Sequence, residues 1–142
     1  MFITHGVLHA GFVHLTVNMI TLWSLGRAVL NRAGLGIFII VYVGASLGAG
    51  AAFALLTTSF RPMVGASGAL FGLMGAILAW EYIERRRRRE SLWDISKIVL
   101  LLVGLNLVLW WAMSGELAWQ AHLGGFVVGW ATAIYVGSRA VR

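Results

Sequence analysis

Leu35–Leu56, with the sequence LGIFIIVYVGASLGAGAAFALL, runs for 22 residues without a charged side chain. The hydrocarbon core of a bilayer is about 30 Å thick, so one helical span needs roughly 20 apolar residues. A helix pairs its own backbone groups in lipid, whereas an open sheet edge leaves them unpaired. The stretch also lacks the alternation of a membrane barrel strand. It therefore predicts a transmembrane helix.

Four further apolar stretches of similar length flank this one: Val7 or Val13 to Leu30, Val64 to Ile83, Ile95 to Met113, and Trp119 to Val136. Hydrophobic residues make up 60% of the 142 positions and charged residues 11%, against about 25% charged in a soluble domain. A core of this size cannot hide so much apolar surface, so lipid is the expected solvent. With short connections at Asn31–Gly34, Thr58–Met63, Arg85–Asp94 and Ser114–Ala118, we predict one all-α membrane domain over residues 1–142, a polytopic bundle of five helices.

The basic residues gather on one side of such a bundle. Ten of the eleven lie on the loops of one side, and the other side has only Arg61; the ten are Arg27, Arg32, Arg85 to Arg89, Lys97, Arg139 and Arg142. The positive-inside rule places that side in the cytoplasm, with the N-terminus outside, and we expect the cell membrane. The arginine run is expected to contact solvent or anionic lipid headgroups. Without an aromatic platform it does not predict nucleic-acid binding. An external N-terminus without a signal peptide predicts a further helix upstream of Met1.

Few polar side chains lie at membrane depth, where they are costly and tend to mark function. They are His9, His14, Asn18, Ser67, Asn106 and His122. The predicted topology puts His14 with Asn18, Ser67, and His122 near the outer surface on three different helices. This convergence predicts a site.

Ser67 lies in Gly65-Ala66-Ser67-Gly68, just after the loop that holds Pro62 and at the start of a helix. A serine in this position commonly caps the helix or allows tight packing. Alternatively it is a nucleophile, whose oxyanion the backbone N–H groups and dipole of the helix would stabilise. Gly65 would let the backbone approach a substrate closely.

His122 precedes Gly125 and Gly129, which form a G-x-x-x-G face that permits close helix contact. The helix of Ser67 offers a matching face at Gly68, Gly72 and Gly75. If the two faces meet, the Ser67 hydroxyl reaches the His122 imidazole, as base-assisted nucleophilic catalysis requires. A packing or hydrogen-bonding role for His122 is the alternative. No Asp or Glu lies at this depth, so we expect a dyad.

His14 and Asn18 are spaced i, i+4 and share a helix face. They either help helices associate or donate hydrogen bonds to an oxyanion. Three histidines, His9, His14 and His122, would suffice for zinc, but no carboxylate lies near them and H-E-x-x-H is absent. The chain also has no cysteine, so we expect neither a metal nor a cofactor.

Three segments together resemble the motifs of rhomboid intramembrane serine proteases. His9 to Asn18 resembles their H-x-x-x-x-H-x-x-x-N signature, Gly65 to Gly68 their G-x-S-G motif, and Ala121 to Gly125 their A-H-x-x-G motif. The motifs occur in family order and span almost the whole chain. The family core has six helices, so the resemblance implies that the first one is absent here.

The resemblance implies that Ser67 is the nucleophile and His122 the general base, with His14 and Asn18 assisting the Ser67 amide at the oxyanion. It further implies that Phe71 packs on the catalytic histidine and that His9 is structural. Gly65 and Trp110 are expected to border the substrate, although Trp110 and Trp111 would also fit an interfacial aromatic belt.

These residues predict an endopeptidase that cleaves the transmembrane segment of another protein near the outer membrane face, with lipid as its other partner. Two alternatives remain: a non-catalytic rhomboid-like protein that binds membrane clients, and a small transporter subunit. The second would predict inverted repeats, and the sequence has none that we recognise.

Overall fold

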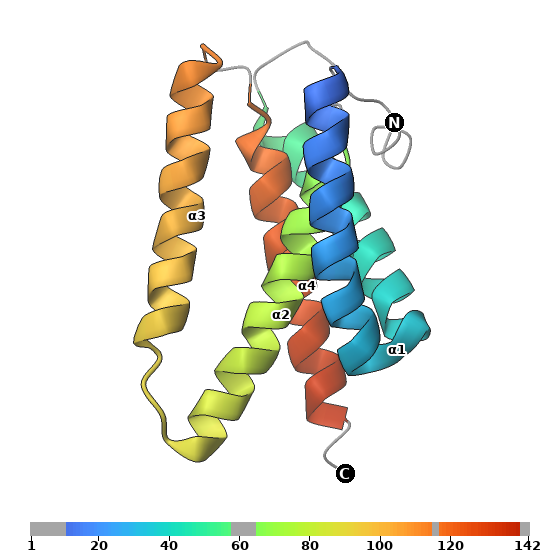
Figure 1. Cartoon of the computed structure of the whole chain (residues 1–142), viewed down its shortest axis with the longest axis vertical. Coiled ribbons are helices and arrows are strands. Elements are labelled where there is room, and N and C mark those ends of the chain that lie inside the picture. Colours follow the sequence, from blue (N-terminus) through green and yellow to red (C-terminus); the bar gives the residue numbers. More distant parts are fainter. Residues whose placement is uncertain (1–10, 58–64, 115–116, 140–142) are drawn as a thin grey trace.

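A computed structural model describes residues 11–57, 65–114 and 117–139, and His9 and the Pro62 loop lie outside these ranges. The described residues form the helices α1 (Phe12–Leu56), α2 (Ser67–Arg88), α3 (Trp93–Ala112) and α4 (Trp119–Arg139), as Figure 1 shows. The prediction of an all-α bundle is confirmed.

The 45 residues of α1 contain two of the predicted spans, because the helix breaks at Gly34. Gly34 has φ 79° and ψ 174°, a conformation that a glycine adopts without the clash that a Cβ would cause. In Figure 1 the arms on either side of this break, residues 12–33 and 35–56, run in opposite directions. The predicted loop at Asn31–Gly34 is thus reduced to one non-helical residue, and the described helical segments cross the bundle five times.

α2 extends further than the predicted span, which ended at Ile83. It continues through the arginine run to Arg88, and Arg89, with φ 56°, ends it. Within this extension Arg85 Nε donates to Glu81 Oε1 at 2.7 Å, one turn earlier, and such i, i+4 pairs support a helix. Cations in the last turn also interact favourably with the helix dipole. The prediction of a loop beginning at Arg85 was therefore wrong by one helical turn.

Glycines bring α2, α4 and the second arm of α1 into close contact. A methyl group added to Gly125 would collide with the carbonyl oxygen of Gly68, and one added to Gly129 would collide with that of Gly72. α2 also meets α1 here, since Gly72 faces Ala45. The predicted contact between the glycine faces of the Ser67 and His122 helices is confirmed, and it fixes the spacing of those two helices.

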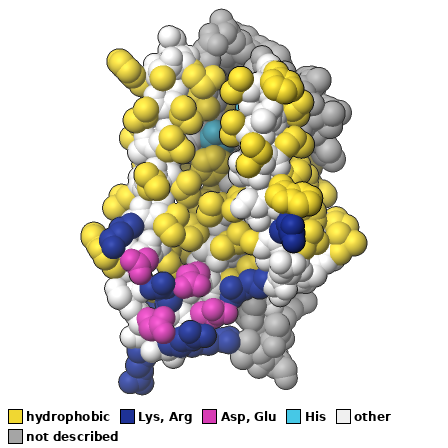
Figure 2. All heavy atoms as spheres, in the orientation of Figure 1, with side chains coloured by type: hydrophobic (Ala, Val, Ile, Leu, Met, Phe, Trp, Pro, Cys, Tyr) yellow, Lys and Arg dark blue, Asp and Glu magenta, His cyan; other side chains and the backbone are white. Residues whose placement is uncertain are grey.

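α3 stands at one side of the bundle (Figure 1) and contributes a single buried residue, Ile95. Beyond Lys97 its exposed side chains are apolar: Leu101 is 70% and Trp111 79% exposed. Of the described helices, α1 and α3 are long and apolar enough to cross a membrane by themselves. Figure 2 shows a broad apolar surface over this face, with most Lys, Arg, Asp and Glu side chains gathered below it. Such a surface suits lipid better than water.

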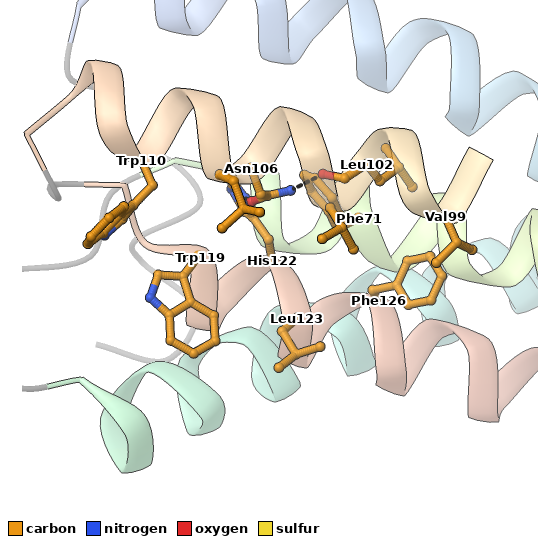
Figure 3. A pocket seen from close by; sticks show the side chains of 11 residues that line it. Phe71, Val99, Leu102, Asn106, Trp110, Trp119, His122, Leu123 and Phe126 are labelled. Carbon is orange, nitrogen blue, oxygen red and sulfur yellow. Dashed lines mark hydrogen bonds between the residues drawn. The ribbon is translucent and has the colours of Figure 1, made fainter. Parts of the chain in front are cut away.

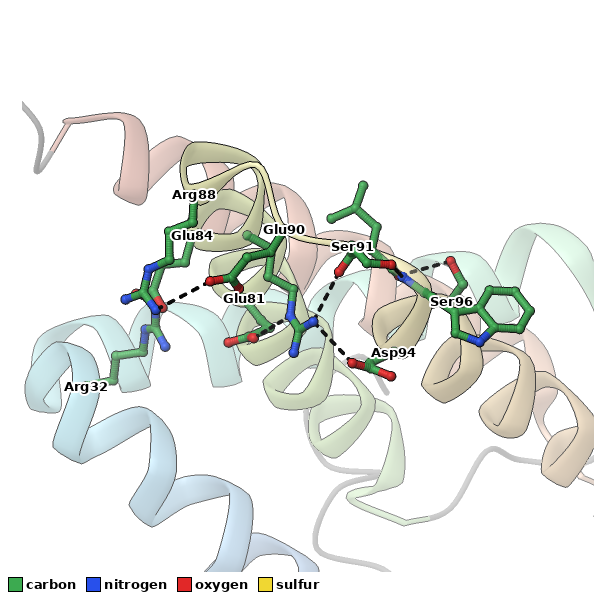
Figure 4. A network of polar contacts seen from close by, with 11 residues as sticks. Arg32, Glu81, Glu84, Arg88, Glu90, Ser91, Asp94 and Ser96 are labelled. Atoms are coloured by element: carbon green, nitrogen blue, oxygen red, sulfur yellow. Dashed lines mark hydrogen bonds and ion pairs between the residues drawn. The ribbon is translucent and has the colours of Figure 1, made fainter.

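The charged end of the bundle, defined by Arg32, Glu84, Arg85 and Asp94, ties three helices together (Figure 4). Arg32 on α1 pairs with Glu84 on α2. The Arg85 guanidinium donates to the Ser91 carbonyl oxygen at 3.1 Å and to Asp94 Oδ2 at 3.2 Å, across the connection to α3. These contacts fix the N-terminal end of α3 against α2.

Candidate active site

Ser67 is the first residue of α2, and its hydroxyl does not cap that helix. The N-cap is Ala66, which makes no side-chain capping bond. Instead, Ser67 Oγ lies 2.8 Å from His122 Nε2 on α4. The first N–H groups of a helix lack partners within it and form the positive end of the dipole. The half-buried hydroxyl thus lies where negative charge is stabilised.

His122 is 8% exposed, and its imidazole is held from three directions. Besides the bond to Ser67, Nδ1 lies 2.6 Å from Asn106 Oδ1 on α3. The ring of Phe71 stacks on the imidazole with centroids 4.3 Å apart and an angle of 10° between the planes. The contact that the resemblance implied for Phe71 is therefore present.

Asn106 was recognised in the sequence as a polar residue at membrane depth, but no partner followed from its position. In the structure its Nδ2 donates to the Leu102 carbonyl oxygen at 2.9 Å, while Oδ1 faces His122 (Figure 3). The cost of an amide in an apolar helix was the available signal. The direction in which the Asn106 side chain points depends on the rotation of α3 about its axis. The nearly uniform hydrophobicity of that helix does not specify this rotation.

His14 and Asn18 lie beside the turn that leads into Ser67. A Cβ added to Gly65 would stand 2.7 Å from His14 Cε1 and 3.6 Å from Asn18 Nδ2, and Gly65 has φ 109°. Asn18 is 4% exposed, and within the described part of the chain its Nδ2 is buried without a hydrogen-bond partner. A buried donor without a partner is costly. The arrangement can therefore offer a hydrogen bond to an anion beside Ser67.

An apolar cleft of about 520 Å³ opens next to His122, between α3 and the pair α2 and α4. Its walls include Phe71, the inward side of α3 from Val99 to Trp110, and the start of α4 from Trp119 to Phe126 (Figure 3). Trp110, which was expected to border the substrate, lines this cleft. Trp111 is not among the lining residues. The described residues contain no group of three His, Cys, Asp or Glu side chains placed to hold a metal ion.

Comparison with known proteins identifies the family of the chain. The family model for the rhomboid domain matches residues 1–139. The chain is 35% identical over 131 residues to the rhomboid protease GluP of Bacillus subtilis, covering 92% of this chain and 25% of that protein. It is 38% identical over 124 residues to RHOMBOID-like protein 5 of Arabidopsis thaliana, covering 86% and 39%. It is 29% identical over 154 residues to mitochondrial Rhomboid protein 1 of Saccharomyces cerevisiae, covering 94% and 40%.

The chain thus spans 25% to 40% of the length of these relatives. The match to the family model, by contrast, covers nearly all of this chain, from residue 1 to residue 139. The chain belongs to the rhomboid family of integral membrane proteins.

Proposed function

We propose that the protein is a serine endopeptidase that cleaves transmembrane segments of other membrane proteins, with Ser67 as nucleophile and His122 as general base. The observation that carries the proposal is the 2.8 Å hydrogen bond between Ser67 Oγ and His122 Nε2. It lies at a helix N-terminus and beside an apolar cleft. A nucleophile within hydrogen-bond reach of a base is the arrangement that acyl transfer needs.

In the proposed reaction Ser67 Oγ attacks the scissile carbonyl carbon while its proton passes to His122 Nε2. The carbonyl oxygen becomes an oxyanion, and collapse of the tetrahedral intermediate breaks the C–N bond as His122 returns the proton to the leaving amine. A water molecule, deprotonated by His122, then attacks the Ser67 ester. As the bond between the carbonyl carbon and Oγ breaks, His122 returns this proton to Ser67 Oγ and the second product is released. The peptide bond and one water are consumed, and a carboxylate and a protonated amine are formed.

The donors around Gly65 would stabilise the oxyanion. The Ser67 backbone N–H at the start of α2, the buried Asn18 amide and His14 all lie near the turn at Gly65. Donors fixed before the reaction starts are worth most in a site from which water is largely excluded. The unpartnered Asn18 Nδ2 supports this role, because a transition-state oxygen would supply the acceptor that the described residues lack.

The substrate is proposed to reach Ser67 through the cleft between α3 and α4. Its apolar walls suit a chain arriving from lipid, and Trp110 and Gly65 would contact the residues around the scissile bond. Ser67 lies at the opposite end of α2 from Arg85 to Arg88. With that charged end in the cytoplasm, cleavage would occur toward the outer face of the cell membrane.

The test uses the full chain in liposomes with a reporter transmembrane substrate and a fluorophosphonate probe. Substituting Ser67→Ala should abolish both cleavage and labelling, and His122→Ala should abolish cleavage. Ser46→Ala is the matched control, since Ser46 is another buried membrane serine (7% exposed) and should leave both signals intact. Cleavage that persists in Ser67→Ala contradicts the proposal. Wild-type protein that binds the reporter but neither cleaves it nor takes up the probe would instead identify a non-catalytic client-binding protein.

A further inference from the structure

The hydrogen bonds of Asn106 determine which way its side-chain amide points. A backbone carbonyl oxygen only accepts hydrogen bonds, so the group 2.9 Å from the Leu102 oxygen must be the amide nitrogen. The amide oxygen then faces His122 Nδ1 at 2.6 Å. An amide oxygen also only accepts, so the proton of this second bond belongs to Nδ1.

The position of that proton decides what His122 can do for Ser67. A neutral imidazole carries one N–H, and its other nitrogen holds a lone pair. With the proton on Nδ1, the lone pair is on Nε2, 2.8 Å from Ser67 Oγ, and can accept the hydroxyl proton. In the other tautomer Nε2 would itself present an N–H to Ser67 and could not act as the base.

We propose that Asn106 is the positioning residue of His122, holding the imidazole in the tautomer and orientation that accept the Ser67 proton. This inference rests on the proposed protease function, since it assigns Asn106 a part in that same site. It adds a third, neutral member to what the sequence predicts as a dyad. Asn106 acts through the imidazole and does not touch the reacting atoms, unlike the Asn18 amide.

The hydrogen bond between Asn106 and His122 depends on the position of α3. α3 has only Ile95 buried, and apart from the contact between Asn106 and His122 the cleft lies between its inner face and α4. Phe71 and Ser67 contact His122 from α2, which packs closely on α4 through the glycine faces. The acceptor for Nδ1 therefore comes from the least packed helix, and His122 is oriented for catalysis only while α3 lies against the site.

The kinetic test compares Asn106→Leu, Asn106→Asp and Leu105→Ala in the full chain, in liposomes with the reporter substrate. Leu is close to Asn in size but cannot accept a hydrogen bond. It should lower kcat about 10- to 100-fold, by analogy with the loss seen when the partner that orients a metal-bound histidine is removed. KM should stay within about twofold, because the substitution removes a hydrogen bond to His122 and not one to the bound substrate. Asp retains an acceptor oxygen and should restore most of kcat. Leu105 is 47% exposed and does not line the cleft, so its variant should behave as wild type.

A second readout requires no turnover. The ¹⁵N NMR spectrum of the chain labelled at histidine should show His122 protonated on Nδ1 in the wild type and a mixture of tautomers in Asn106→Leu. If the wild type cleaves no substrate, the proposed function fails while this spectrum still tests the hydrogen bond. An unchanged tautomer in Asn106→Leu, or a loss of kcat that Asp does not restore, overturns the assignment of Asn106.

Discussion

Gly125→Ala tests whether the glycine contact between α2 and α4 sets the geometry of the site. The added methyl carbon would lie 2.7 Å from the carbonyl carbon of Gly68 and would collide with its oxygen. Unstrained carbon contacts lie at about 3.5–4.0 Å, so the two helices must separate by about 1 Å. The neighbouring atoms are backbone, which cannot turn aside as a flexible side chain would.

The cost follows from two opposing effects. Overpacking of this kind typically costs about 1–3 kcal/mol, whereas replacing a helical glycine by alanine returns about 0.5–1 kcal/mol. We therefore expect a net loss of about 1–2 kcal/mol, which lowers Tm by about 3–8 °C for a chain of this size. Gly68 adjoins Ser67, and Gly125 follows His122 by one turn. A misplacement of about 1 Å between a nucleophile and its base can cost about 100-fold in rate.

The assay combines a thermal melt in detergent micelles with kcat for the reporter substrate in liposomes. Gly104→Ala is the matched control, since a Cβ on Gly104 of α3 would meet no atom within 4 Å. It should melt at or slightly above the wild-type temperature and cleave normally. If Gly125→Ala is as stable and as active as Gly104→Ala, the reasoning from close glycine packing is wrong.

Three further substitutions separate the contributions of other contacts. Asn18→Ala should lower kcat about 100-fold. It should barely change Tm, because the buried Nδ2 has no hydrogen bond to lose among the described residues. Stopped-assay kinetics measure the first effect and a thermal melt the second. Gly65→Ala should cost about 1–3 kcal/mol of unfolding free energy, because φ is 109° and His14 lies 2.7 Å from the new carbon; Gly36→Ala, in open space, is its control in the same melt. Arg85→Ala should lower Tm only slightly, because its ion pairs with Glu81 and Asp94 are partly exposed to solvent. That difference should shrink in high salt, and melts at two salt concentrations measure it.

The sequence was most informative where small residues and motifs coincide. Gly125 and Gly129 predicted a close helix contact, and the structure forms it with Gly68 and Gly72. That contact also predicted that Ser67 would reach His122, and the two side chains are hydrogen-bonded. Glycine faces are predictable because only the absence of a Cβ permits backbones to approach so closely. The catalytic roles of these residues remain proposals.

The sequence was less informative where one physical preference competes with another. At Arg85 to Arg88 high charge suggested a loop, but the pair with Glu81 and the helix dipole extend α2. In α3 the apolar side chains are spread around the helix, so no hydrophobic stripe indicates which face meets the bundle. The contact between Asn106 and His122 was unpredictable for that reason, since it depends on the rotation of α3.

The ion pair between Arg85 and Asp94 fixes α3 near its N-terminal end, so the helix can tilt about that end as a rigid rod. Asn106 lies 12 residues beyond Asp94, which at 1.5 Å per residue is about 18 Å along the helix axis. If α3 tilted by about 5° at its fixed end, Asn106 would move by about 1.6 Å at this distance along the helix. That displacement is enough to break its 2.6 Å hydrogen bond to His122. A small angular change at the ion-paired end of α3 is thus sufficient to make or break the hydrogen bond that orients the His122 imidazole at a distance of about 18 Å along the helix.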